Sequence, residues 1–178
     1  MRPSAGLRPI ATCSPSNFEL ARSFGAENTF DYRSPTCAAD IRAYTHNALA
    51  YALDCVSLVE TTQLCYSAIG RAGGRYVALE PCRETITNTR RVVQASWLMV
   101  LTIFGDKVAL DGEYGREARP EDREFGSRLF AAAQVLLDRG EIQPHPIKSM
   151  PGGWKGVIEG VDIIRAQTLS AQKLVYAL

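Results

Sequence analysis

The sequence predicts an α/β fold with a doubly wound parallel sheet. Short runs rich in β-forming residues alternate with longer segments in which apolar residues recur at helical spacing. Strand, helix and strand in this rhythm are typical of βαβ units, whose strands lie parallel. In addition, 46% of the 178 residues are hydrophobic, which is enough for a sizeable core.

The first strand and helix are expected near the start of the chain. Residues 8–13 predict the strand, and Ser14 after it has the chemistry of a helix N-cap. Pro15 stands at the first helical position, where a missing N–H costs nothing. Gly25 suits the left-handed position that follows a helix.

The next elements repeat this pattern. Strands are predicted at residues 28–32, 49–55 and 75–79, and helices at residues 38–44 and 59–69. Gly70 closes the second helix, and Gly73 and Gly74 form the turn into the following strand. Residues 97–104 are apolar apart from Thr102 and predict a longer strand.

The last third begins with a change of character. Residues 113–124 are densely charged, which indicates a solvated surface loop. Pro120, Glu121 and Asp122 open a helix that runs to about Arg139, with its acidic residues at the positive end of the helix dipole. A strand, a helix and a strand are then predicted at residues 145–150, 153–165 and 173–178.

Charge and composition exclude several classes of partner. Twenty basic residues balance nineteen acidic ones, so there is no excess to neutralise nucleic-acid phosphates. The longest apolar run is too short for a membrane span, and the first residues lack the apolar core of a secretory signal. We therefore expect a cytoplasmic protein with neither a nucleic-acid nor a membrane partner. None of the five cysteines is spaced Cys-x-x-Cys, so no metal site is expected.

The first strand–helix junction is the candidate ligand site, because ligands bind beyond the carboxyl ends of parallel strands. Its residues are Ser14, Pro15, Ser16 and Asn17. A carboxylate at this junction would bind the ribose diol of NAD and repel a 2′-phosphate, and none stands here before Glu19. The junction therefore favours NADP. Tyr32 ends the next strand, where it is placed to stack on the adenine or contact the phosphate. A simple capped helix remains the alternative interpretation.

A glycine-rich dinucleotide fingerprint is missing from this pattern. Residues 70–74 hold three glycines, but they precede a strand instead of linking a strand to a helix. The fingerprint needs the second context, so a tight turn is the better interpretation.

Several segments read in order resemble one known family. They are Ala11-Thr12-Cys13-Ser14-Pro15-Ser16-Asn17, Gly25-Ala26-Glu27-Asn28-Thr29-Phe30-Asp31-Tyr32-Arg33, Tyr51-Ala52-Leu53-Asp54-Cys55, Ala68-Ile69-Gly70-Arg71-Ala72-Gly73-Gly74 and Leu169-Ser170-Ala171-Gln172-Lys173-Leu174-Val175. Together they resemble the trans-acting enoyl reductases of fungal polyketide gene clusters, which are zinc-independent medium-chain dehydrogenase/reductases.

The resemblance implies an NADPH-dependent reduction of an enoyl thioester in secondary metabolism. The substrate would be carried by the acyl carrier domain of a partner polyketide synthase, and the protein would be a monomer rather than a homodimer. Other zinc-independent quinone or enone reductases, an inactive remnant and a nucleotide-binding module without catalysis are the alternatives.

The resemblance also assigns site residues, although no catalytic residue. The cofactor-binding residues implied are Ser14, Pro15, Ser16, Asn17, Tyr32, Leu79, Glu80, Leu169 and Ser170. The residues implied to line the acyl pocket are Val100, Leu101, Thr102, Ile103 and Phe104.

One departure from the family concerns what precedes these segments. The chain resembles the C-terminal part of the Rossmann-type sheet, without the GroES-like domain and the Gly-Ser-Thr-Ala-Thr-type phosphate loop of family members. Residues 1–143 are therefore expected to be an incomplete NADP-binding domain, and residues 144–178 a segment that belongs to a GroES-like domain. The missing strand is the central one, so its neighbours should have an unpaired edge and an exposed apolar face.

Overall fold

The computed structural model describes residues 6–166 and 168–177. Its contacts divide the chain into two units, Met1–Val135 and Leu136–Leu178, and each unit is considered by itself. The assignment of residues 1–143 and 144–178 to two domains of different type stays a prediction.

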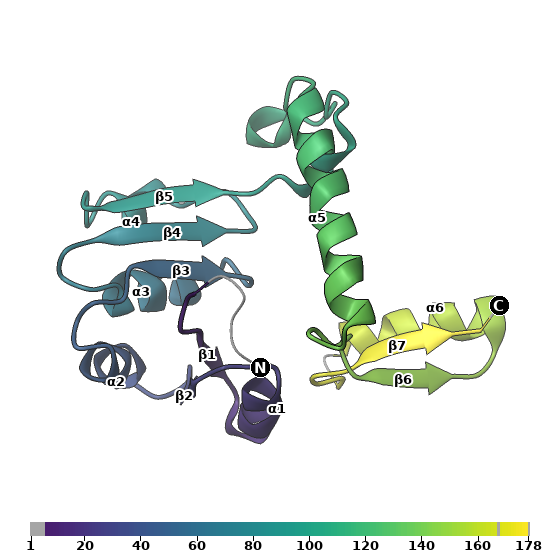
Figure 1. Ribbon diagram of the computed structural model, residues 1–178, viewed down its shortest axis with the longest axis horizontal. Helices are drawn as coiled ribbons and strands as arrows, with labels where there is room; N and C mark the ends of the chain where they lie inside the picture. Colours follow the sequence, from purple (N-terminus) through teal and green to yellow (C-terminus); the bar gives the residue numbers. More distant parts are fainter. Residues whose placement is uncertain (1–5, 167, 178) are drawn as a thin grey trace. The chain divides into compact units, whose positions relative to one another are not determined.

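The first unit begins with a pair of parallel strands (Figure 1). Strand β1 (Ile10–Cys13) is followed by a short 3₁₀ helix (Pro15–Asn17) and by α1 (Phe18–Ser23). Strand β2 (Asn28–Asp31) follows and lies parallel to β1. The chain turns toward β2 at Gly25, whose φ of 104° is the left-handed conformation expected after the helix.

A second sheet follows the helix α2 (Cys37–Tyr44). It has the order β3-β4-β5 and is parallel throughout. The elements are β3 (Tyr51–Asp54), α3 (Val59–Ala68), β4 (Gly74–Ala78), α4 (Glu84–Thr87) and β5 (Val93–Trp97). The predicted α/β class with parallel sheets is confirmed, whereas α4 and most of β5 were not predicted from the sequence.

The strand predicted at residues 97–104 is wrong. Strand β5 ends at Trp97, and Val100–Phe104 form a 3₁₀ helix. Thr102 donates its hydroxyl to the Met99 carbonyl, and Gly105 ends the helix with a φ of 81°. An unbroken apolar run cannot reveal such a turn, because its residues suit a strand and a short helix equally well.

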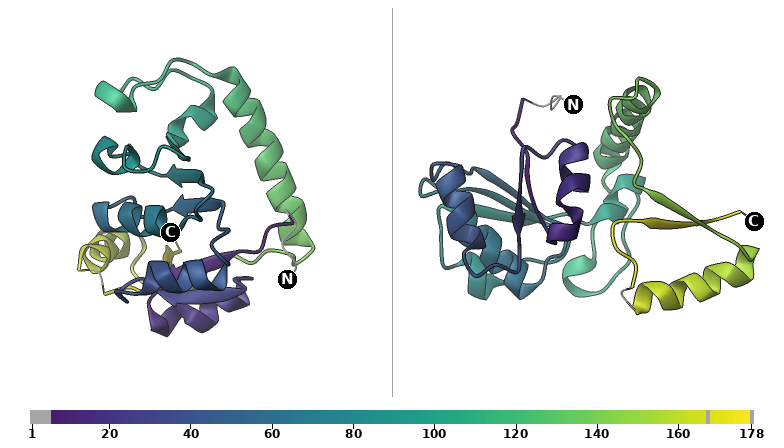
Figure 2. Two further views of the ribbon diagram at one scale, coloured as in Figure 1. Left: turned by 90° about the vertical axis from the view of Figure 1, so that its left-hand side faces the viewer. Right: turned by 90° about the horizontal axis from the view of Figure 1, so that it is seen from below.

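The core of the first unit lies between the sheets and the helices α2 and α3. Tyr66, Ile69, Tyr76 and Ala78 form its larger buried cluster beside the second sheet. Cys37, Ile41 and Ala68 form a second cluster, against which Ile10 and Phe30 of the first sheet also pack. Helices α2 and α3 lie side by side in Figures 1 and 2 and thereby connect the two sheets.

Strands β1 and β3 each end a sheet without a neighbour on one side. The first sheet contains β1 and β2, and the second begins at β3, so no described strand joins β1 to β3. Two large apolar side chains of β3 are exposed: Tyr51 keeps 60% of its surface and Leu53 keeps 62%. These are the unpaired edges and the apolar face that the sequence predicts.

The second unit is a small parallel βαβ arrangement. Strands β6 (Ile147–Met150) and β7 (Lys173–Tyr176) flank α6 (Gly153–Arg165) in the sequence and pair in parallel. The boundary between the two units falls within the helix α5 (Pro120–Asp138). Gly156 and Gly160 let α6 approach β7 closely, because a Cβ atom at Gly160 would lie 2.1 Å from the Tyr176 hydroxyl. None of the helices within the described residues has the length and apolar character needed to cross a membrane.

Candidate functional site

The carboxyl end of the first sheet brings two of the predicted site segments together. Cys13 ends β1 directly opposite Asp31, which ends β2. The turn Ser14–Asn17 therefore leaves the sheet beside Tyr32. Strand register alone thus places the predicted junction and the predicted tyrosine at one edge, where ligands of parallel sheets bind.

The junction itself exposes neutral polar groups. The Asn17 backbone N–H donates to the Ser14 carbonyl at 2.8 Å, and its side-chain amide reaches the Ser14 hydroxyl at 3.4 Å. Pro15 and Ser16 are exposed. Ser14 precedes the 3₁₀ helix as predicted, but its side chain makes no capping bond within the described structure. The hydroxyl is therefore not used as a cap.

Arg33 is a further candidate for the site, and the sequence reasoning missed it. Its guanidinium lies 5.3 Å from the centre of the Tyr32 ring, and its Nε donates to the Tyr32 hydroxyl at 3.2 Å. Its backbone N–H donates to the Asp31 carboxylate, while no described acidic side chain forms an ion pair with its guanidinium. A cation directly after the second strand was the available signal, since such a group suits a phosphate.

Asp31 places a carboxylate at the same edge, although the first junction has none. Burial and the nearby Asp31 charge together raise the pKa of the Cys13 thiol. The carboxylate accepts the Arg33 backbone N–H at 3.0 Å, so part of its acceptor capacity is used within the turn.

Asp54 organises the carboxyl end of the second sheet. Its side chain is 4% exposed and accepts hydrogen bonds from the backbone N–H groups of Val56 and Ser57, at 3.0 and 2.8 Å. The hydroxyls of Thr61 and Tyr76 donate to its other oxygen at 2.8 and 2.9 Å. A buried carboxylate with four donors is fully satisfied and holds the loop after β3 in one conformation.

Ser57 links the loop after β3 to the residue that follows β4. It has a positive φ of 60°, and its hydroxyl donates to the Asp54 carbonyl. The Ser57 hydroxyl oxygen also accepts a hydrogen bond from the backbone N–H of Leu79, the residue directly after β4, at 2.9 Å. The predicted cofactor residues Leu79 and Glu80 are thus fixed to the β3 loop.

Glu80 also joins an aromatic cluster beside the end of β5. The Tyr114 hydroxyl donates to its carboxylate at 2.9 Å, and the ring of Tyr114 packs edge-on against Trp97. Arg116 places its guanidinium 4.4 Å from the centre of the Trp97 ring. The cluster covers the end of the sheet next to the predicted acyl pocket.

The predicted acyl-pocket residues follow β5 at this end of the sheet, on the 3₁₀ helix instead of a strand. Val100, Leu101 and Phe104 are exposed, by 71%, 41% and 64%, whereas Thr102 and Ile103 are half-buried. The first three therefore form the available apolar surface.

The remaining predicted cofactor residues lie in the second unit. Leu169 and Ser170 stand between α6 and β7. Within residues 6–166 and 168–177, no three His, Cys, Asp or Glu side chains are grouped so that they could hold a metal ion.

Curated relatives match almost the whole chain, although no family model does. This chain is 67% identical over 175 residues to the trans-enoyl reductase caaB of Aspergillus niger. The match covers 98% of this chain and 48% of that protein. The chain is 64% identical over 173 residues to the trans-enoyl reductase thnE of Trichoderma harzianum, covering 97% and 47%. The resemblance inferred from the sequence is confirmed, and the chain spans about half the length of these relatives.

Solved structures agree on the fold. The JamJ enoyl reductase matches with a TM-score of 0.70 at 15% identity, over 97% of this chain and 47% of its own. A quinone oxidoreductase from Pseudomonas syringae matches with a TM-score of 0.71 at 14% identity, over 97% and 50%. At these identities the likeness concerns the fold alone.

Proposed function

We propose that this chain, a homologue of the fungal trans-enoyl reductases over about half their length, supplies the NADPH-binding half of an enoyl reductase that acts in trans. The 67% identity to the Aspergillus niger relative carries this proposal, because the match covers 98% of this chain. The reaction is the reduction of the α,β-double bond of an enoyl thioester. NADPH supplies the hydride for the β-carbon, and the α-carbon takes up a proton.

The first sheet fits the adenosine phosphate end of the cofactor. Ser14 and Asn17 offer a hydroxyl and an amide, and Arg33 offers a cation with no acidic ion-pair partner in the described chain. Tyr32, with its exposed ring, is suited to the adenine. The donors of Ser14, Asn17 and Arg33 favour a 2′-phosphate over a free ribose hydroxyl, and the Asp31 carboxylate at the same edge is engaged by the Arg33 backbone N–H.

The second sheet fits the other end of the cofactor and the substrate. Leu79 and Glu80 are held by the Asp54 and Ser57 hydrogen bonds, so their backbone is ordered before a ligand binds. Val100, Leu101 and Phe104 supply apolar surface for an acyl chain. Leu169 and Ser170 are proposed as cofactor residues on the sequence resemblance alone. We assign the partner as a polyketide synthase whose acyl carrier domain delivers the thioester.

The test uses a restored protein, defined as this chain joined after the half of the Aspergillus niger relative that it does not match. NADPH consumption is followed with a pantetheine-linked enoyl thioester, with the same thioester on an acyl carrier domain, and with a quinone. We expect turnover of both thioesters, with the higher kcat/KM for the carrier-bound form. Turnover of the quinone alone would instead favour a quinone reductase, the function named for the Pseudomonas syringae structure.

A further inference from the structure

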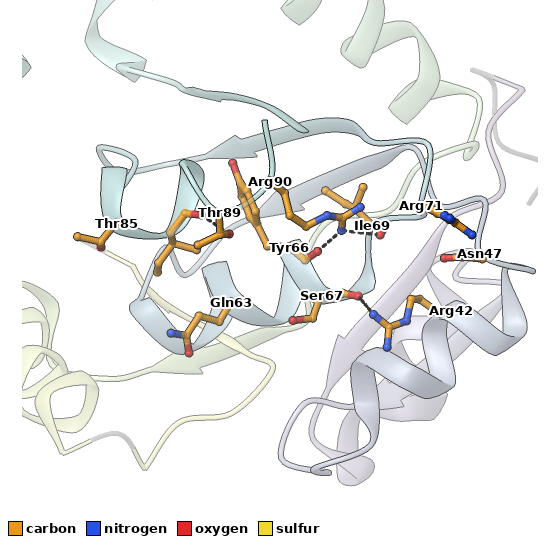
Figure 3. A pocket seen from close by; sticks show the side chains of 11 residues that line it. Arg42, Asn47, Gln63, Tyr66, Ser67, Ile69, Arg71, Thr85, Thr89 and Arg90 are labelled. Carbon is orange, nitrogen blue, oxygen red and sulfur yellow. Dashed lines mark hydrogen bonds between the residues drawn. The ribbon is translucent and has the colours of Figure 1, made fainter. Parts of the chain in front are cut away.

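A pocket of about 540 Å³ opens at the opposite end of the second sheet, between α2, α3 and α4 (Figure 3). It lies where β4 and β5 begin, whereas the proposed cofactor and substrate residues of this unit follow the carboxyl ends of the strands. Three arginines, Arg42, Arg71 and Arg90, are among its lining residues, and no acidic residue is.

Arg90 is held in place by the last turn of α3. Its guanidinium donates to the carbonyls of Tyr66 and Ile69 through one nitrogen, and to the Gly70 carbonyl at 2.7 Å through another. The carbonyls at the end of a helix lack helical partners, so Arg90 caps α3 through Tyr66 and Ile69, while the Gly70 carbonyl also accepts the Gly73 N–H at 3.0 Å. The cation is therefore positioned before any ligand arrives.

Arg42 approaches the same helix from α2. It donates to the Ser67 carbonyl at 2.7 Å, as Figure 3 shows, and its other N–H groups make no further bond to the described residues. Arg71, in the turn after α3, is exposed and makes no hydrogen bond or ion pair among residues 6–166 and 168–177. Arg71 therefore has no role in capping α3, and its charge is left for a ligand.

The charge at this pocket is unbalanced. The C-terminal end of a helix such as α3 carries about half a negative charge. The two positive charges of Arg42 and Arg90 already exceed it, and Arg71 adds a third. None of the three arginines forms an ion pair within the described chain. Thr85 and Gln63 add a hydroxyl and an amide at the rim. The lining thus presents donors and positive charge to a ligand that must supply acceptors.

We propose that this pocket binds a small anion through phosphate or carboxylate oxygens. Guanidinium groups from three different elements match such oxygens in charge and in planar geometry. The site is separate from the proposed cofactor edge, so the proposal does not depend on the reductase function.

Calorimetric titration of the restored protein with inorganic pyrophosphate, in NADP⁺ to occupy the cofactor edge, tests the proposal. We expect one pyrophosphate per chain, and an affinity about tenfold weaker in each of Arg71→Ala and Arg42→Ala. Arg128→Ala, which removes an exposed arginine from α5, is the matched control and should bind as the unchanged protein does. A parallel titration with citrate separates the sources: binding of both anions indicates carboxylates as well as phosphates, and binding of pyrophosphate alone indicates a phosphate ligand.

Arg71→Ala keeps the test decisive even if loss of the Arg42 bond to Ser67 disturbs α3. Millimolar pyrophosphate and citrate that both fail to bind would overturn the proposal. So would binding that Arg71→Ala leaves unchanged, because the anion would then occupy another place.

Discussion

The hydroxyl of Tyr76 on β4 donates to the buried carboxylate of Asp54 on β3 at 2.9 Å. The same hydroxyl lies 3.0 Å from the hydroxyl of Thr62 on α3. Burial raises the pKa of Tyr76, so the phenol stays protonated and remains a donor at physiological pH. One side chain thus joins two strands and a helix directly below the loop that holds Leu79.

Removing this hydroxyl should cost more stability than its small size suggests. In Tyr76→Phe the ring remains packed, but Asp54 loses one of four donors in a site that water does not reach. A hydrogen bond to a charged group contributes about 1.5–3 kcal/mol, and we expect a loss of that order in the urea unfolding of the restored protein. Tyr44→Phe on α2 is the matched control, because the Tyr44 hydroxyl donates to the Glu27 carboxylate at an exposed site, where water can replace it. Equal losses in both variants would contradict the role given to Asp54.

Cofactor preference should depend on the charge at the end of the first sheet. Ser14→Asp places a carboxylate beside the 2′-phosphate position, and Arg33→Ala removes the cation. Each change should weaken NADPH binding about tenfold and NADH binding far less, as measured by fluorescence titration of the restored protein. Ser23→Asp adds the same charge at the end of α1 and should leave both affinities unchanged. Equal affinity of the unchanged protein for NADPH and NADH would argue against this reading of the edge.

Chain-length selection should depend on the exposed side of the 3₁₀ helix after β5. Val100 is 71% exposed, whereas Thr102 is half-buried and bonded to the Met99 carbonyl. Val100→Phe should therefore lower kcat/KM for long enoyl thioesters more than for short ones, with NADPH affinity unchanged. Val135→Phe, the same change at an exposed valine of α5, is the control and should leave the chain-length preference unchanged. A uniform loss over all chain lengths in Val100→Phe would place the acyl chain elsewhere.

Two cysteines should differ sharply in reactivity. Cys55 is exposed, whereas burial, with nearby Asp54, raises the pKa of Cys65 to about 12. Since the thiolate is the reactive form, Cys65 should stay unmodified even at pH 9, whereas the exposed Cys55 is accessible to the reagent. Peptide mass spectrometry after iodoacetamide treatment measures both residues in one sample. Early modification of Cys65 in folded protein would show that its surroundings are open.

The sequence predicted the elements with strong local signals and missed those set by tertiary contacts. Pro15 and Gly25 mark the bounds of the first helical segment because their own backbone preferences act locally. The break between Trp97 and Val100 is invisible in an apolar run, and Gly105 was its only marker. Arg33 was missed although it is next to Tyr32 in the sequence, because only the pairing of β1 with β2 brings this segment beside the Ser14 turn.

The chain on its own should fold poorly, because β1 and β3 each lack a neighbour. Their unpaired N–H and C=O groups form a template for other strands, and the exposed Tyr51 and Leu53 add an apolar surface beside it. In the second unit, α6 leaves Ile158 exposed by 70%. We therefore expect the 178-residue chain to aggregate when expressed alone, to bind NADPH weakly and to reduce no enoyl thioester above background.

The edge itself can be tested within the isolated chain. Leu53→Lys places a charge on the exposed side of β3, where charged side chains discourage strand pairing. Light scattering should show less aggregation of this variant than of the unchanged chain, whereas Val56→Lys, beyond the end of β3, should have little effect. In the restored protein the same Leu53→Lys change should instead lower the unfolding temperature, since a strand and its covering side chains would then occupy that edge. A cooperative thermal transition and micromolar NADPH binding by the unchanged isolated chain would show that the open edges do not limit folding.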